Sequence, residues 1–491
     1  MTRYRHLITD ANAKWWTLGA MCFALFMIML DNTVINVALP SIQRDLHASI
    51  GALEWAINGY TLSFGVLLVT GGRLGDIFGR RRMFLAGVAI FAITSATAGL
   101  AASPEMLIGS RVLQGFGAAL MMPATLSIVT NAFSPAERGR AIGTWAGVSA
   151  LALAIGPLLG GFLVEHVSWR AIFFINLPVA VIAIVATLFA VRESRDRTIA
   201  RVIDFPGVAV LTTGLTAIVL ALIEGNAWGW GSPAIVALLA GGALLLVAFV
   251  AVERRVRAPM VEFSFFGERN FLGSTAVAFI ISFAMLGTFF FMAIYMQNVL
   301  GYDALEAGVR FLPTTLMIVL IAPLAGRLTD RIGPLWPIAA GMSILTVSMF
   351  MFAQIDAATT FADLLIPFIL MGIGIAMTMS PMSTAAMNAV SNQKAGVASG
   401  ILTMSRMVGG SVGIAASGAI FQAQLGGFDP AALATGGAGA RGDFADALAT
   451  AMEVSAVVVL LGVIISLATI RGRGSRAPAA PPPEAAERAP A

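Results

Sequence analysis

Fourteen long apolar runs constrain this chain more than any other feature of its sequence. A helix that crosses a lipid bilayer needs about 20 consecutive, mostly apolar residues. Runs of this kind occur near residues 15–38, 53–72, 83–102, 106–131, 140–162, 170–191, 206–224, 232–252, 271–298, 308–326, 335–354, 362–388, 396–421 and 449–470. Only 11% of the residues are charged, whereas soluble proteins have about 25%. The sequence therefore predicts an all-α integral membrane protein with fourteen transmembrane helices.

Basic residues are distributed unevenly between the two sides of these runs. With a cytoplasmic N-terminus, most of the 30 Lys and Arg residues fall in inner loops and tails, and the outer side keeps only Arg44, Arg170, Arg310 and Arg441. Such an excess is typical of cytoplasmic loops, so we predict a multi-pass cell-membrane protein with both termini cytoplasmic. Because the positive charge lies in loops, it does not indicate nucleic-acid binding. The near-absence of lysine is typical of a GC-rich, bacterial genome.

Two similar loops indicate an internal repeat. The segment 71-GGRLGDIFGRRR-82 follows the second run, and 325-AGRLTDRIGP-334 follows the tenth. Repeats in transporters relate two halves that enclose a site near the membrane midplane. Eight runs separate the two loops, whereas two six-helix halves would place six between them. The runs near 206–224 and 232–252 are therefore predicted to be an insertion between the halves.

The predicted organisation has five parts, the fourth of which contains one long loop. The parts are a cytoplasmic N-terminus (1–14), an N-terminal six-helix bundle (15–191), a linker with two extra transmembrane helices (192–270), a C-terminal six-helix bundle (271–470) and a disordered cytoplasmic tail (471–491). Residues 422–448 are rich in Gly and Ala and are predicted to form an outer loop.

Five motifs follow one another in a fixed order. They are 30-LDNTVINVALP-40, 72-GRLGDIFGRR-81, 111-RVLQGFGAA-119, 156-GPLLGG-161 and 169-WRAIFFINLP-178. In this order the motifs resemble those of the major facilitator superfamily, and within it the fourteen-helix drug/proton antiporter family. The resemblance implies the major facilitator fold, with two six-helix halves plus two inserted helices. The chain departs from the family pattern at Ala152, where we expect Gly, and in residues 308–326, which lack the acid found in some relatives.

The same resemblance implies proton-coupled export (antiport) of hydrophobic drugs or antibiotics, cationic ones included, by alternating access. The expected partners are the small-molecule substrate, protons and the lipid bilayer, and we expect a monomer without a cofactor, driven by the proton-motive force. An importer or facilitator of a small metabolite on the same fold is the alternative. A ligand sensor would need a signalling domain that we do not find, and no catalytic constellation, metal-binding cluster or ATP-binding loop indicates an enzyme.

Asp31 is a carboxylate inside the first apolar run. It lies about 10 Å from the predicted end of its helix at about 1.5 Å per residue, and a charge at this depth costs roughly 3 kcal/mol. A structural hydrogen bond to a neighbouring helix would be one explanation. Since Asp31 is the only acid predicted well inside the spans of the N-terminal half, we expect it to carry the proton.

Arg111 and Arg406 are two cations inside predicted spans. Arg111 lies about five residues into its run, from where a long side chain could reach the interface. The resemblance instead implies a role for Arg111 in proton coupling, beside an acid whose charged form it would favour. For the substrate we predict contacts with Asn32, Asn36, Gln114 and Arg406.

The repeated loops and the proline-glycine motif are predicted to control conformation. In the loops, an acid beside arginines could pair between helices and hold one gate state, although a basic cluster that only sets orientation is the alternative. The predicted gating residues are Gly72, Arg73, Asp76, Gly79, Arg80, Arg81, Gly326, Arg327, Asp330 and Arg331. The predicted antiporter motif, which could also be a simple tight helix crossing, consists of Gly156, Pro157, Gly160 and Gly161.

Overall fold

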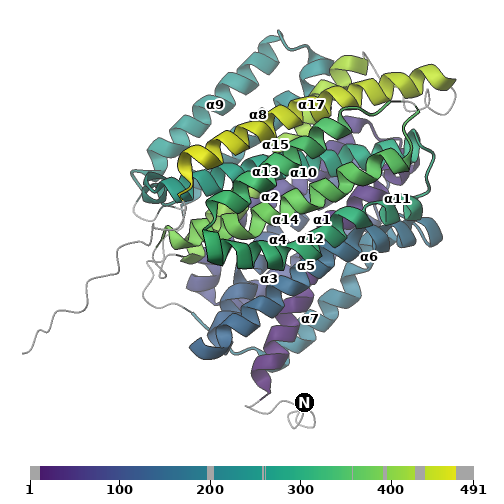
Figure 1. The fold of residues 1–491 in the computed structure, drawn as a ribbon. Helices are drawn as coiled ribbons and strands as arrows, with labels where there is room; N and C mark the ends of the chain where they lie inside the picture. The colour runs from purple at the N-terminus through teal and green to yellow at the C-terminus, as the bar shows by residue number, and fades with distance from the viewer. Residues whose placement is uncertain are drawn as a thin grey trace, which may run out of the picture.

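The computed structural model of this chain consists of helices and short connections, with no strand in the part that it describes (Figure 1). That part comprises residues 12–195, 204–256, 259, 261–356, 358–390, 395–425 and 437–471. Nearly all of the predicted N-terminal and C-terminal tails lie outside the described residues.

The helices of the N-terminal half are α1 (Ala13–Leu46), α2 (Ile50–Phe78), α3 (Arg80–Gly99), α4 (Pro104–Ala132), α5 (Pro135–His166), α6 (Ala171–Phe174) and α7 (Asn176–Ala190). Two further helices follow, α8 (Phe205–Trp228) and α9 (Pro233–Glu253), and then a 3-10 helix, η1 (Phe263–Gly267). The C-terminal half contains α10 (Arg269–Asn298), α11 (Ala304–Arg310), α12 (Leu312–Ile332), α13 (Leu335–Phe352), α14 (Phe361–Asn388), α15 (Ala395–Leu425) and α17 (Gly437–Thr469).

The predicted all-α membrane fold is confirmed. Among the described residues, 13 helical segments are long and apolar enough to cross a membrane. The remaining predicted run, near 140–162, lies within α5, which has 32 residues. Two of the runs are each built from a short helix and a longer one, α6 with α7 and α11 with α12.

Two predicted boundaries were wrong. Helix α1 continues through Pro40 to Leu46, so Asp31 lies about 22 Å from its end rather than 10 Å at 1.5 Å per residue. The predicted loop 422–448 is also partly helical, because α15 extends to Leu425 and α17 begins at Gly437. Phe444, within this predicted loop, is fully buried and meets Phe421 edge to face, with 4.7 Å between the ring centroids.

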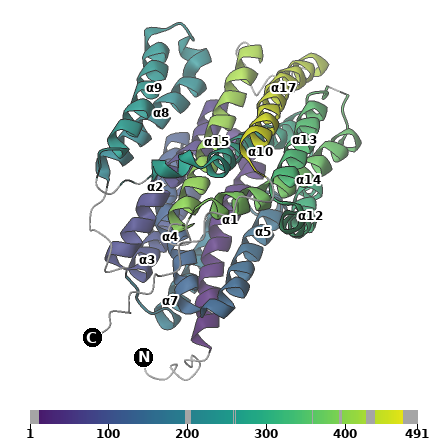
Figure 2. The same cartoon turned by 60° about the vertical axis from the view of Figure 1, so that its left-hand side comes forward.

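The inserted pair α8 and α9 lies at the edge of the molecule, beside α15 and α2 (Figure 2). Helix α8 contacts both halves: Asn226 Nδ2 donates to the carbonyl of Ala419 in α15 over 2.7 Å, and Ile223 packs against Gly51 of α2. The insertion therefore bridges the line along which α2 and α15 meet.

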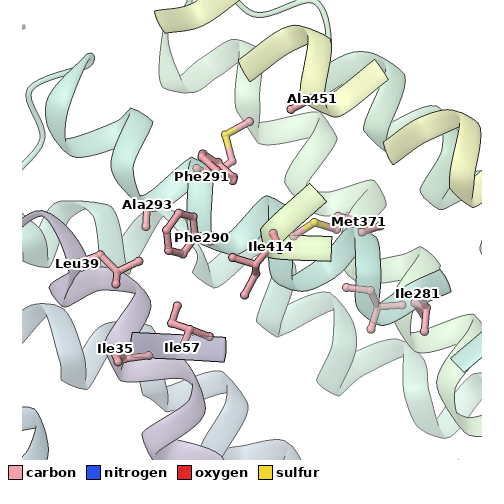
Figure 3. Close-up of a cluster of buried hydrophobic side chains, with 14 of the residues drawn as sticks. Ile35, Leu39, Ile57, Ile281, Phe290, Phe291, Ala293, Met371, Ile414 and Ala451 are labelled. Atoms are coloured by element: carbon pink, nitrogen blue, oxygen red, sulfur yellow. The ribbon is translucent and has the colours of Figure 1, made fainter. Parts of the chain in front are cut away.

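Apolar side chains from both halves meet in the interior (Figure 3). Ile35 and Leu39 of α1 and Ile57 of α2 lie near Phe290 of α10 and Ile414 of α15, and all five are buried. We call the side of the molecule where α1 begins the near side, and the side where α1 ends the far side. With antiparallel neighbours, α2 begins at the far side and α15 ends there.

The halves are in contact at the far side. Gln297 Nε2 of α10 donates to the carbonyl of Val37 in α1 over 2.9 Å, and the amide of Ala304 in α11 donates to Glu165 of α5 over 3.4 Å. Within the N-terminal half on the same side, the side chains of Trp169 and Arg170 both donate to the Asp45 carboxylate, over 3.0 and 2.7 Å.

Candidate functional site

Asp31 lies in the interior of the N-terminal half, where its side chain is 1% exposed. Three donors converge on its carboxylate. Arg111 Nη1 of α4 donates to Oδ2, while Gln114 Nε2 of α4 and Asn176 Nδ2 of α7 donate to Oδ1 over 2.9 and 3.0 Å. The acid on α1 is thus held by two other helices of the same half.

Arg111 is fully buried and makes contacts on every side. Its Nε donates to the carbonyl of Ala56 in α2 over 3.1 Å, and its Nη1 also donates to Gln114 Oε1 over 2.7 Å. The guanidinium lies over the Tyr60 ring, 4.2 Å from the centroid, where a cation is attracted to the aromatic face. Arg111 therefore does not reach the membrane interface, and it joins α1, α2 and α4.

The local sequence explains how α4 can bring Arg111 this close. A Cβ atom at Gly115 would lie 2.0 Å from Ser63 Oγ, and one at Gly117 would lie 2.8 Å from the backbone of Phe91. These glycines allow α4 to pack directly against α2 and α3, as small residues do between membrane helices. The segment 111-RVLQGFGAA-119 thus combines the polar pair with the close approach that buries it.

Asn176 belongs to this cluster, although it was not among the residues predicted for the site. Its Nδ2 also donates to Ser95 Oγ of α3 over 2.9 Å, and Ser95 in turn donates to the carbonyl of Phe173 over 2.8 Å. The signal was its position in 169-WRAIFFINLP-178, where an amide follows an apolar stretch. Asn176 extends the cluster to α3 and α7 and orients the carboxylate.

We expect Asn176→Ala to lower the transport that the sequence resemblance implies by roughly tenfold or more, without abolishing it. The substitution removes one of three donors to Asp31, and a hydrogen bond to a charged group contributes about 1.5–3 kcal/mol. Arg111 and Gln114 still hold the carboxylate. The measurement is the initial transport rate at equal protein abundance, and the matched control is Asn131→Ala, the same change at an exposed amide of α4.

The other predicted substrate contacts do not join the cluster. Asn32 Nδ2 donates to the carbonyl of Ile28 and Asn36 Nδ2 to that of Asn32, over 3.1 and 3.2 Å, so both amides bond the backbone of α1. Arg406 lies on α15 in the other half, where it donates to Thr403 over 3.4 Å. Of the four predicted contacts, only Gln114 touches Asp31.

The first repeated loop is held by two carboxylates. Asp76 of α2 pairs with Arg80 of α3 over 2.8 Å, so the acid links two helices of one half. Glu193, which was not predicted, accepts from the backbone amides of Arg81 and Arg82 over 3.1 and 3.2 Å. Gly79 has φ +116° and a Cβ there would meet the Glu193 carboxylate, so the turn requires glycine.

The second repeated loop is arranged differently. Asp330, Arg327 and Arg331 are exposed, and no ion pair joins them among the described residues. Gly326 lies where α12 approaches Ser380 of α14, 3.6 Å from the position of an added Cβ. The repeat is therefore present in sequence, but only its first copy is tied by an ion pair in this conformation.

The proline-glycine motif brings α5 against both halves. A Cβ at Gly156 would overlap Thr33 of α1, and one at Gly160 would lie 2.9 Å from the Val34 carbonyl. A Cβ at Gly161 would lie 2.5 Å from the Ala304 carbonyl of α11, in the other half. The motif is thus a close contact that helps to close the far side.

One further acid was missed. Glu54, at the edge of the second predicted run, is fully buried on α2 and faces α15. It lies near the beginning of α2, where α15 and α8 cover it, and not as deep in its helix as Asp31. The predicted run 53–72 contained Glu54 but did not mark it as a candidate site residue.

Comparison with known proteins is consistent with this architecture. The Major Facilitator Superfamily profile matches residues 21–414, and the chain belongs to this family of membrane transporters. A bacterial homologue of the human lysosomal transporter Spinster, solved in an inward-facing and unoccupied conformation, has the same fold, with a TM-score of 0.69 at 18% identity over 93% of this chain and 97% of that one.

Several of its relatives in sequence are antibiotic or multidrug resistance proteins. The chain is 37% identical to the tetracenomycin C resistance and export protein of Streptomyces glaucescens, over 84% of this chain and 77% of that protein. It is 39% identical to the puromycin resistance protein of Streptomyces alboniger, over 82% and 80%. A multidrug resistance protein of Mycobacterium tuberculosis is 36% identical, over 83% and 76%.

Proposed function

We propose that this protein exports hydrophobic drugs or antibiotics across the cytoplasmic membrane in exchange for protons. The observation that carries this proposal is the buried pair of Asp31 and Arg111, tied to Gln114 and Asn176 in the middle of the N-terminal half. Resistance and export proteins among the relatives support the substrate class. The near side is the cytoplasmic side in this proposal, as the basic loops predict.

The pair can link protonation of Asp31 to a change of conformation, because the charge of Arg111 is neutralised only while Asp31 is ionised. Protonation of the carboxylate removes the partner of Arg111 and leaves a buried cation, which costs several kcal/mol per ion. Arg111 also donates to the carbonyl of Ala56 in α2. A movement of the Arg111 side chain would therefore displace α2, the helix that packs against the other half. Proton binding and the relative position of the halves are thereby linked.

Substrate binds between the halves in this proposal, where apolar side chains of α1, α2, α10 and α15 face one another (Figure 3). An apolar site with few polar contacts tolerates many hydrophobic ligands. Arg406, Asn32 and Asn36 remain proposed contacts. The protein works without a cofactor and as a monomer.

A resistance panel in a pump-deficient host tests the function. Cells that carry the protein should tolerate hydrophobic antibiotics at concentrations that kill the empty host, and collapse of the proton gradient should abolish this protection and the measured efflux. Export that continues at the same rate after the gradient is collapsed would overturn proton antiport. Uptake of a small metabolite into vesicles, with no efflux of any drug in the panel, would favour the alternative, an importer or facilitator.

A further inference from the structure

Glu54 is a buried acid that the proposed transport cycle does not yet use. It lies on α2 near the far side, is 0% exposed, and neither of its carboxyl oxygens has a hydrogen-bond partner among the described residues. Asn58, one turn further along α2, is also fully buried, and both of its amide atoms lack a partner. Two unsatisfied polar side chains on one face of a helix are unusual, because buried polar groups are almost always bonded.

The face that carries Glu54 meets the other half. A Cβ on Gly418 of α15 would lie 2.0 Å from Glu54 Oε1, so the carboxyl rests directly on the backbone of α15. Further along, Gly65 of α2 meets Met407 in the same way. We call this antiparallel contact of α2 with α15 the seam. The carboxyl lies within the seam, where α15 of the other half covers it.

Polar groups of two other helices lie beside the carboxyl. From α15, the Gln422 amide is placed to donate to it, although its Nε2 forms no hydrogen bond of normal geometry. From α8, Glu224 is the charged group that faces it. From α4, Arg111 reaches the same stretch of α2, but it is bound to the Ala56 carbonyl and to Asp31. Among the residues that the structure describes, no ion pair includes Glu54, and the charged group that faces it from α8 has the same sign.

We propose that Glu54 is a second proton-binding site, and that the seam closes only when its carboxyl group carries a proton. An ionised carboxylate without a counter-charge is costly to bury, and a neighbouring acid adds repulsion. With the seam open, the carboxyl meets water from the far side and loses or gains its proton there. This inference adds a second site to the proposed proton cycle, and it gives α8, one of the two inserted helices, a part in it through Glu224.

Protonation of Glu54 determines how closure of the seam depends on pH. The neutral acid stabilises the closed seam, so closure is favoured at low pH and is lost as the pH rises. If one proton is bound on closing, the ratio of open to closed molecules changes by up to about tenfold per pH unit. Glu54→Gln keeps the shape of the neutral acid and cannot ionise, so it should stay closed over the whole pH range.

The experiment measures the seam directly, without substrate. Spin labels are placed at the exposed positions Arg44 and Gln424, at the far ends of α1 and α15, after the lone Cys22 is replaced by Ser. Distances are recorded by pulsed electron resonance from acidic to alkaline pH. The control is Glu105→Gln, the same change at an exposed acid on the far side, which should titrate as the parent does.

The proposal is overturned by a label distance that does not depend on pH in the parent, or by unchanged pH dependence in Glu54→Gln. If Asp31→Asn alone removes the dependence, the titrating acid is Asp31 and the proposal also fails.

Gly418→Ala is a second variant that tests the seam. Its methyl group takes the space of the carboxyl, so it should open the seam at every pH, and a closed seam in this variant would contradict the arrangement. Because no transport is measured, the result does not depend on whether drug export is proton-coupled.

Discussion

Export by the double variant Asp31→Asn/Arg111→Gln should fall to the level of cells that lack the protein, while the double variant folds better than either single variant. Each single substitution leaves one polar group of the pair badly matched. In Arg111→Gln the Asp31 carboxylate keeps only Gln114 and Asn176, and in Asp31→Asn the guanidinium is a buried cation without a counter-ion. Breaking one side of a buried pair costs about 3–5 kcal/mol.

The double variant separates structure from transport. The double variant has no uncompensated buried charge, which is the main cost in each single variant, so protein abundance and thermal stability should return toward the parent values. A pair that only holds helices together would regain export along with stability. A proton carrier would not, because no group at residue 31 can then bind and release a proton. Export is measured as proton-driven efflux in vesicles, and recovery of efflux in the double variant would refute the proton role of Asp31.

The fold could be predicted from sequence because lipid allows few alternatives. Backbone groups in the bilayer must be satisfied within each segment, so long apolar runs become helices. The resemblance at the five motifs then supplied the arrangement of the halves. Helix ends were harder: Pro40 and the polar residues after it looked like a helix end, yet α1 continues to Leu46, because neighbouring helices and not the sequence alone decide where a helix stops.

The site was predicted in part, for a similar reason. Asp31 and Arg111 stand out as charges in apolar runs, and their pairing follows from burial. Asn176 and Glu193 do not stand out, since an amide or an acid near a helix end is ordinary in sequence. Their roles depend on which helices pack together, as with Asn32, whose amide turns out to bond its own helix. Periodicity within one helix cannot reveal contacts between helices.

Replacement of Gly308 by Ala should block closure of the far side and reduce transport strongly. Gly308 of α11 packs on Pro157 of α5, and an added Cβ would lie 2.2 Å from the Pro157 carbonyl. Backbone cannot move aside as a side-chain end can, and overpacking costs about 1–3 kcal/mol. If this overpacking destabilises only the closed state, the ratio of open to closed molecules changes by roughly 5–150-fold. Gly161→Ala, on the facing helix, should act in the same direction, since its Cβ would meet the Ala304 carbonyl.

Gly147→Ala is the matched control for these two variants. Gly147 lies on α5 as Gly161 does, but nothing lies within 4 Å of its added Cβ, so it should transport as the parent does. Because Ala favours a helix over Gly by about 1 kcal/mol, none of the three changes should unfold its own helix. Transport is measured in proteoliposomes beside thermal stability. Normal transport by Gly308→Ala would mean that α5 and α11 need not approach this closely, whereas lost transport with retained stability places the cost on closure itself.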